Sequence, residues 1–380
     1  MDNPLLKRPR ILFLFSDTGG GHRSAAEAII EALRLEYGES VETEMVDIFK
    51  QYAPHPLDHV PELYPKMVRV PQAWGLGYHL SNNRRANLMV ASLYPYVRRP
   101  LYRLLSEHPS DLIVSVHPLA NWPVLRTLGA QHPPYITVVT DLVTTHALWY
   151  DRRTDLCLVP TEPAYQRALR FGLEPERVKI VGLPVAERFC RPPGNREAIR
   201  ARYGWPQERP LVLLMGGGEG MGPLEEIART IAASCPHVSL VVIAGRNHSL
   251  KERLNQIQWP IPTFIYDFVR EMPDFMHAAD ILVTKAGPGT ICEALIAGLP
   301  MVLYSRLPGQ EEGNVHYTVK EGAGVWAPRP ELIASAICNW IEHPEERKRV
   351  AAACRRLARP QAARQIARIL IDQIERVAEL

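Results

Sequence analysis

Three short apolar runs in this sequence each lead into a glycine-rich turn. Residues 11–15 (ILFLF) precede the glycines at 19–21, residues 211–215 (LVLLM) precede a glycine group that begins at Gly216, and 281–283 (ILV) precede a third turn. A strand that turns through glycine into a helix is the repeating unit of a parallel α/β sheet. Because two such openings lie about 200 residues apart, the sequence predicts two similar α/β domains, each a Rossmann-like, doubly wound sheet.

The third turn also has the character of a phosphate site. Residues 284–293 read TKAGPGTICE, and a helix-like stretch follows. The N-terminus of a helix after such a turn leaves unpaired N–H groups that bind phosphate. Glu293 falls one turn inside the helix, where a carboxylate can accept from ribose hydroxyls. The spacing fits neither the Walker nor the dinucleotide motif. It indicates a nucleotide diphosphate site, and a tight glycine turn without a ligand is the alternative.

Composition is that of a globular chain with two domains. The 380 residues are 46% hydrophobic and 22% charged, with a net charge of +3. No apolar run approaches the ~20 residues that span a bilayer. The six cysteines form no close metal-type pairs, so we expect reduced core cysteines in a cytosolic protein.

The strand and helix pattern divides the chain near 187–196, a segment with the composition of a linker. A helix is expected at 22–36 and an amphipathic one at 361–378. Strands are expected at 11–15, 41–47, 112–116, 135–140 and 155–159, and again at 211–215, 239–244, 263–266, 280–283 and 300–304.

Five motifs occur in the order seen in monogalactosyldiacylglycerol synthases, a family that the chain resembles over nearly its whole length. They are SDTGGGHR (16–23), GLPV (182–185), AGRN (244–247), TKAGPGTI (284–291) and PGQEEGN (308–314). Bacterial diacylglycerol glucosyltransferases share much of the pattern, and the N-acetylglucosaminyltransferase of the peptidoglycan lipid precursor is a more distant likeness. The resemblance implies GT-B glycosyltransferase architecture, two doubly wound domains facing a cleft. Its parts are an acceptor and membrane domain (1–188), a UDP-sugar domain (197–360) and a helix that crosses back (361–380).

The resemblance also implies a set of donor-binding residues. Phe268 and Val269 are expected to hold uracil, Glu293 the ribose, and Gln310 and Glu311 the sugar hydroxyls. Further candidates come from the turns themselves: Gly20, Gly21, Gly216, Gly217, Arg246, Asn247, Lys285, Gly287, Pro288, Gly289, Thr290 and Ile291. Lys285 either reaches the phosphates or ends the strand, and a surface turn explains Arg246 and Asn247 nearly as well.

A general base is expected at the first glycine turn. His22 opens the first helix, and an imidazole with an ordinary pKa of about 6.5 can take a proton from a hydroxyl or donate to a phosphate. Asp17 is the rival base, or only a cap of the turn. Asp141, His146 and Trp149 resemble a family segment that lines the cleft, and His117 has a loop setting like that of His22.

Residues 63–106 carry seven basic residues and no acidic one, with aromatic residues between them. This composition suits the headgroups of an anionic membrane; a nucleic-acid patch and a solvated basic face are the alternatives. With the family resemblance we favour a peripheral protein on the cytoplasmic face of the membrane and expect no nucleic-acid partner. The expected acceptor and membrane residues are Trp74, Arg84, Arg85, Arg98, Arg99, Asp141, His146 and Trp149.

The predicted activity is an inverting transfer of a hexose, with galactose favoured, from a UDP-sugar to 1,2-diacylglycerol, which gives a β-glycosyl lipid. There is no Asp-x-Asp pair, so we expect no metal and no cofactor. Alternatives are a UDP-glucose-dependent diacylglycerol glucosyltransferase, a transferase acting on a polyprenyl diphosphate lipid, a UDP-sugar epimerase and a non-enzymatic UDP-sugar sensor. The sequence fixes neither the sugar nor the oligomeric state.

Overall fold

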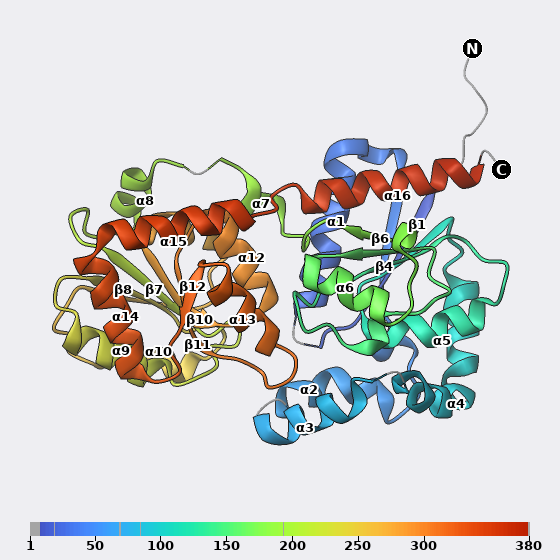
Figure 1. Cartoon of the computed structure of the whole chain (residues 1–380), viewed down its shortest axis with the longest axis horizontal. Helices are drawn as coiled ribbons and strands as arrows, with labels where there is room; N and C mark the ends of the chain where they lie inside the picture. The colour runs from blue at the N-terminus through green and yellow to red at the C-terminus, as the bar shows by residue number, and fades with distance from the viewer. Residues whose placement is uncertain (1–7, 19, 68–69, 84, 193, 379–380) are drawn as a thin grey trace, which may run out of the picture. The chain divides into compact units, whose positions relative to one another are not determined.

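The computed structural model describes residues 8–378 except 19, 68–69, 84 and 193. The chain forms two compact units (Figure 1). The first comprises 1–187, 307–310 and 361–380, and the second comprises 188–306 and 311–360. The short segment 307–310 was not expected in the first unit.

The described residues of the first unit form a parallel sheet in the order β2-β1-β3-β4-β5-β6. Its strands are β1 (Arg10–Phe15), β2 (Glu42–Asp47), β3 (Leu112–Ser115), β4 (Tyr135–Val138), β5 (Leu156–Val159) and β6 (Val178–Ile180). All but β6 were predicted. Its helices are α1 (Gly21–Tyr37), η1 (Gly38–Ser40), η2 (Ile48–Tyr52), η3 (Leu57–His59), α2 (Val60–Met67), α3 (Pro71–Ser81), α4 (Ala86–Glu107), α5 (Pro118–Leu128), η4 (Ala147–Trp149), α6 (Glu162–Arg170), η5 (Pro175–Arg177) and α16 (Ala362–Ala378).

The two faces of the first sheet are covered by different helices because strand side chains alternate. Ile11 and Phe13 of β1 pack with α1 and with Ile366 of α16. Leu12 and Leu14 instead pack with α4 and α5. Figure 1 shows α16 and α5 on opposite sides of this sheet. The apolar stripe of the last helix therefore belongs to the core of the first unit.

The second unit repeats the plan. Its described residues form a parallel sheet in the order β12-β11-β10-β7-β8-β9. The strands are β7 (Leu211–Met215), β8 (Ser239–Ile243), β9 (Thr263–Tyr266), β10 (Ile281–Lys285), β11 (Met301–Ser305) and β12 (Gly324–Trp326). The helices are α7 (Glu187–Cys190) at the boundary, α8 (Arg196–Tyr203), α9 (Leu224–Ser234), α10 (His248–Asn255), α11 (Met272–Ala278), α12 (Pro288–Ala297), α13 (Glu312–Lys320), α14 (Pro330–Glu342) and α15 (Pro344–Leu357).

The expected linker at 187–196 contains the boundary between the units, after Glu187, as well as α7 and the first residue of α8. Two sequence predictions need correction. Strand β12 was missed. The cysteines are not all reduced, because a disulfide joins Cys235, just after α9, to Cys338 in α14. Within the described part of the chain, the helices all fall short of the length and apolar character that a bilayer crossing needs.

Candidate functional site

Four polar side chains meet where strands of the first sheet end. His22 follows β1, His117 follows β3, and Thr140 and Asp141 follow β4. The carboxyl ends of parallel strands share one edge of a sheet, which is where open α/β folds bind ligands. Gly20 has φ +76° immediately before α1, a left-handed conformation that glycine adopts without strain. This turn lets α1 begin directly with Gly21 and His22.

His22 is held as a neutral imidazole. Its Nδ1 lies 2.7 Å from Oγ1 of Thr140, and its ring meets His117 edge-on at 4.6 Å between centroids. Burial lowers the pKa of His22 to about 4, against a smaller opposing effect of a hydrogen bond with the backbone of Val116. The ordinary pKa expected from the sequence is therefore wrong, and the ring is uncharged at neutral pH.

His117 is buried beside His22, which its loop setting in the sequence did not indicate. Only 3% of it is exposed, and burial lowers its pKa well below the usual value. Its Nε2 lies 3.0 Å from Oγ1 of Thr18, whereas its Nδ1 has no hydrogen-bond partner among the described residues. A buried, unpaired ring nitrogen beside His22 is costly unless a ligand or water meets it.

Asp17 is held in an ion pair with Arg23. Both of its carboxylate oxygens accept hydrogen bonds of 2.6 Å from Arg23. The hydrogen bonds to Arg23 are the largest effect on its pKa and lower it. A carboxylate held in this way is a weaker proton acceptor than a free one.

Asp141 is a buried carboxyl group with two side-chain donors. Trp149 Nε1 donates to Oδ2 at 2.7 Å, and Gln310 Nε2 donates to Oδ1 at 3.2 Å. Burial raises the pKa of Asp141, although both hydrogen bonds oppose the shift. Gln310 Oε1 has no hydrogen-bond partner among the described residues, so the amide keeps a free acceptor for a ligand hydroxyl.

His146 and Trp149 are buried side chains that contact other residues of the first unit. Trp149 is 0% exposed and lies behind Asp141. His146 caps η4, because its Nδ1 accepts from the N–H of Leu148 at 3.2 Å, and its Nε2 lies 3.1 Å from Oγ of Ser81. Burial lowers the pKa of His146 to about 4.

In the second unit the predicted phosphate turn has the expected form. Gly287 precedes α12, and Pro288 is its first residue, where the missing proline N–H costs nothing. A side chain at Gly289 would meet no atom within 4 Å, and Pro288, Gly289 and Thr290 are all partly exposed. In the described chain no side chain caps this end. The first N–H groups of α12 are therefore open to an anion.

Lys285 lies beside this helix start. Its Nζ is 3.3 Å from Oε1 of the buried Glu311. A Cβ at Gly217, which has φ +73°, would stand 3.2 Å from Lys285 Cε. Gly217 therefore leaves room for the lysine. Gly216 instead accommodates the backbone of Met221, and the side chain of Ile291 is fully buried.

Glu293 is partly buried on α12. Burial raises the pKa of its carboxyl group to about 7, and the positive charge of Arg188 opposes this shift. The sequence predicts a carboxylate here that accepts from ribose hydroxyls. The structure instead makes it a group that titrates near neutral pH.

The loop after β8 and the loop after β9 meet through Arg246. Its guanidinium carbon lies 4.7 Å from the ring centre of Phe268, and its NH1 donates to Glu219 at 2.6 Å. Phe268 is 50% exposed, and its neighbour Val269 is partly buried. Asn247 caps α10 by accepting from the N–H of Leu250, so its side-chain oxygen is already used.

The predicted basic segment is also apolar at its surface. Of the fifteen large apolar or aromatic side chains that are strongly exposed among the described residues, nine lie between 63 and 102. They are Leu63, Val70, Leu76, Leu80, Leu88, Met89, Leu93, Tyr96 and Tyr102. Arg85, Arg98 and Arg99 are exposed and Trp74 is partly buried, while Arg84 lies outside the described residues. A concentration of exposed apolar side chains marks an interaction surface.

Two family models together match most of the chain. Residues 22–185 match monogalactosyldiacylglycerol (MGDG) synthase, and residues 211–366 match the C-terminal domain of glycosyltransferase family 28. A rice protein (Oryza sativa subsp. japonica) named probable monogalactosyldiacylglycerol synthase 2, chloroplastic, is 39% identical over 366 residues, which is 93% of this chain and 78% of that protein. Monogalactosyldiacylglycerol synthase 1, chloroplastic, of Arabidopsis thaliana is 36% identical over 371 residues, or 93% and 69%.

Solved structures with the same fold are more distant in sequence. A UDP-GlcNAc 2-epimerase from Neisseria meningitidis bound to UDP-GlcNAc is 14% identical, with a TM-score of 0.61 over 96% of this chain and 100% of that chain. MurG of Acinetobacter baumannii is 14% identical, with a TM-score of 0.60 over the same shares. These likenesses concern the fold alone, and the fold is GT-B, as the sequence predicted.

Proposed function

Because this chain belongs to the monogalactosyldiacylglycerol synthase family, we propose that it transfers a galactosyl group from UDP-galactose to 1,2-diacylglycerol. The product is a β-galactosyl-diacylglycerol. The observation that carries this proposal is the relationship over 93% of the chain to proteins named for that lipid product. The first unit supplies the base, and the second unit supplies the groups that hold the nucleotide.

The base in this proposal is His22. The free hydroxyl of diacylglycerol attacks the anomeric carbon of galactose, the bond from that carbon to the diphosphate breaks, and the hydroxyl proton passes to the imidazole. A neutral imidazole has one ring nitrogen that carries no proton, and the lowered pKa of His22 supports this neutral form. A group with a pKa of about 4 is a weak base, so the proton moves late, as the attacking oxygen gains positive charge.

The leaving diphosphate is held at the start of α12. The open N–H groups at Gly289 and Thr290, the helix dipole and the Lys285 ammonium all favour negative charge there. Glu293 binds the ribose hydroxyls, Phe268 and Val269 hold the uracil, and Gln310 and Glu311 contact the sugar. The free acceptor on Gln310 supports its part in this arrangement. No metal is required by this set.

Diacylglycerol is a membrane lipid, so we further propose peripheral attachment through α2, α3 and α4 on the cytoplasmic face. The nine exposed apolar side chains and the exposed Arg85, Arg98 and Arg99 support a surface that inserts apolar groups while its arginines contact anionic headgroups.

The test is a mass-resolved assay with diacylglycerol vesicles and either UDP-galactose or UDP-glucose. Galactosyl-diacylglycerol as the main product supports the proposal. Glucosyl-diacylglycerol from UDP-glucose, with little product from UDP-galactose, would retain the enzyme class and replace the sugar. Epimerised UDP-sugar without any lipid product would reject the transferase.

A further inference from the structure

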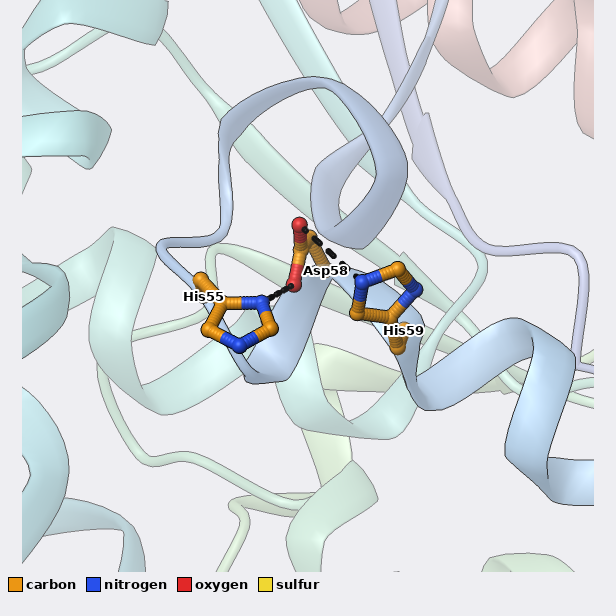
Figure 2. A group of neighbouring side chains, drawn as sticks. All are labelled: His55, Asp58 and His59. Atoms are coloured by element: carbon orange, nitrogen blue, oxygen red, sulfur yellow. Dashed lines mark ion pairs between the residues drawn. The ribbon is translucent and has the colours of Figure 1, made fainter.

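Three side chains with metal-binding atoms meet at the surface of the first unit, between η2 and α2. They are His55, Asp58 and His59 (Figure 2). We propose that this cluster binds a divalent transition-metal ion of the zinc type. The segment contains none of the residues discussed for the sugar transfer, so the ion has a structural role and is separate from the reaction.

The spacing of the ligand atoms suits one ion. His55 Nδ1 lies 3.5 Å from Asp58 Oδ1, and His59 Nε2 lies 3.9 Å from Asp58 Oδ2. The three ligand atoms all lie within 4.8 Å of one another. Ligands at about 2.0–2.1 Å from a tetrahedral zinc ion stand about 3.4 Å apart. Figure 2 shows both imidazole rings directed at the carboxylate, and small rotations of exposed side chains complete the geometry.

A second carboxylate orients one of the histidines. His59 Nδ1 lies 3.3 Å from Oε2 of Glu62. When Nδ1 donates its proton to this carboxylate, the lone pair of the neutral ring is on Nε2, the nitrogen that faces Asp58. A histidine fixed by a carboxylate on its far nitrogen is the usual outer-shell arrangement of a zinc ligand.

The carboxylate at the centre also needs a positive partner. Asp58 Oδ1 has almost no contact with solvent and accepts no hydrogen bond from the described residues. An ion pair with a protonated His55 is the competing explanation, but at 3.5 Å it provides no good hydrogen bond. A metal ion between the rings and the carboxylate satisfies the oxygen and both nitrogens together.

The donor set selects the kind of metal. Two imidazole nitrogens and one carboxylate oxygen suit zinc, and also cobalt, nickel and copper in their divalent states. Calcium and magnesium prefer oxygen ligands alone. Three protein ligands on a partly exposed surface leave the fourth position to water.

The site would fix the start of the apolar segment. The Tyr96 hydroxyl of α4 donates to the backbone carbonyl of His55, and His59 immediately precedes α2. One ion therefore joins the loop that α4 contacts to η3, which leads directly into α2. We expect bound zinc to slow backbone exchange at residues 57–63.

The experiment uses the full chain freed of metal with EDTA and then dialysed, with zinc chloride as the titrant in calorimetry. We expect one tight site per chain, absent in the double variant His55→Ala/His59→Ala. Asp58→Asn should weaken binding by at least ~10-fold and Glu62→Gln by roughly 10–100-fold, the range for loss of an outer-shell partner. His237→Ala, which removes an exposed histidine of the second unit, is the matched control and should bind zinc as the parent does.

Two further measurements make the result decisive. Cobalt should give a visible absorption band in the parent and not in the double variant, and zinc should slow hydrogen–deuterium exchange at 57–63 only in the parent. Equal zinc affinity in the parent and the double variant would overturn the proposal, as would absence of binding in the parent. Circular dichroism of each variant shows whether it is folded.

Discussion

At the scale of single residues, His22 and Asp17 occupy the same glycine turn but have opposite electrostatic settings. Burial keeps His22 neutral, while Arg23 holds Asp17 as a carboxylate. We expect His22→Ala to lower turnover by about 10²–10⁴-fold, the usual cost of losing a general base, with little change in UDP affinity. Steady-state kinetics and calorimetric UDP titration measure the two effects.

Asp17→Asn is the comparison variant for this test. It keeps the size of the side chain and removes the charge that Arg23 pairs with, so its loss of turnover should be much smaller than that of His22→Ala. A larger loss in Asp17→Asn than in His22→Ala would place the base at Asp17.

The affinity for UDP should depend on pH through the carboxyl group of Glu293. Its pKa of about 7 means that roughly a tenth of the carboxyl groups are ionised at pH 6. If the carboxylate accepts from ribose hydroxyls, UDP affinity should fall by several-fold between pH 8 and pH 6. Glu293→Gln should bind UDP more weakly at pH 8, by about 1.5–3 kcal/mol, and lose this part of the pH dependence. Equal pH profiles in both proteins would remove Glu293 from the ribose site.

The raised pKa of Glu293 also makes the stability of the second unit depend on pH. The folded-state pKa of Glu293 lies above the unfolded value, so folding free energy is lost as the pH rises from about 4.5 to about 7, and the loss stays constant above that range. Glu293→Gln should therefore stabilise the second unit at pH 8, by about 1–2 kcal/mol after allowance for partial exposure. The gain should vanish near pH 4.5. Thermal unfolding at the two pH values measures it.

The sequence predicted which residues follow a strand. It did not predict which side chains pack around those residues. The motif around His22 and the turn at Gly287 were found because glycine and strand patterns are local. The ion pair of Asp17 with Arg23 depends on the exact path of the turn between them. The full burial of Trp149 depends on packing between distant segments, which no spacing reveals. Desolvation by neighbouring segments also shifts the pKa values of His22 and Glu293, and it cannot be read from either motif.

At the scale of elements, the strands that were missed are the short ones at sheet edges. Both β6 and β12 have three residues and lie at the end of their sheet. Such strands bury too little to show an apolar run. The longer central strands, such as β1 and β7, are apolar throughout because helices cover both faces, and the sequence predicted them within one residue.

The proposed membrane attachment depends on exposed side chains of the helices α2, α3 and α4. Leu76 and Leu80 of α3 are 63% and 69% exposed, and burying a leucine side chain is worth about 1.5–3 kcal/mol. Changing both to serine should weaken binding to neutral and anionic vesicles alike, by ~10-fold or more in a sedimentation assay. Leu332→Ser, at an exposed leucine of the second unit, is the control and should have no effect.

The arginines of the same segment should act differently. Changing Arg85, Arg98 and Arg99 to glutamine should weaken binding to anionic vesicles only, by about 1 kcal/mol per charge, and the remaining binding should depend less on salt. Unchanged binding in both the leucine and the arginine variants would show that another surface meets the lipid.

At the scale of the whole molecule, the two units should respond differently to acid. Burial lowers the pKa of His22, His117 and His146 in the first unit. Unfolding lets these rings take up protons near pH 6.5, so stability falls as the pH drops below that value. Asp141, whose pKa is raised by burial, offsets part of the loss. A net uptake of about two protons corresponds to roughly 3 kcal/mol per pH unit.

The second unit contains two partly buried groups whose pKa shifts have opposite effects on stability. Burial lowers the pKa of His277 and raises that of Glu293, and these shifts have opposite effects on stability as the pH falls. Hydrogen–deuterium exchange at pH 7 and pH 5 should therefore show the first unit opening first. Earlier loss of protection in the second unit would contradict this account.

The chemistry of the whole enzyme gives the last prediction, that transfer needs no divalent metal. The helix start at Gly289 and Thr290, with Lys285 beside it, offers the leaving diphosphate N–H groups, a dipole and a positive charge. We expect transfer to a soluble short-chain diacylglycerol to keep most of its rate in saturating EDTA. The soluble acceptor removes membrane attachment from the assay, so stripping an ion from His55 and His59 should not change the rate.

We also expect a β product, because one displacement inverts the α-linked donor. Activity lost on chelation and restored by magnesium or manganese would require a cation at the diphosphate. An α product would be more damaging, since it would exclude the single displacement in which His22 acts as base.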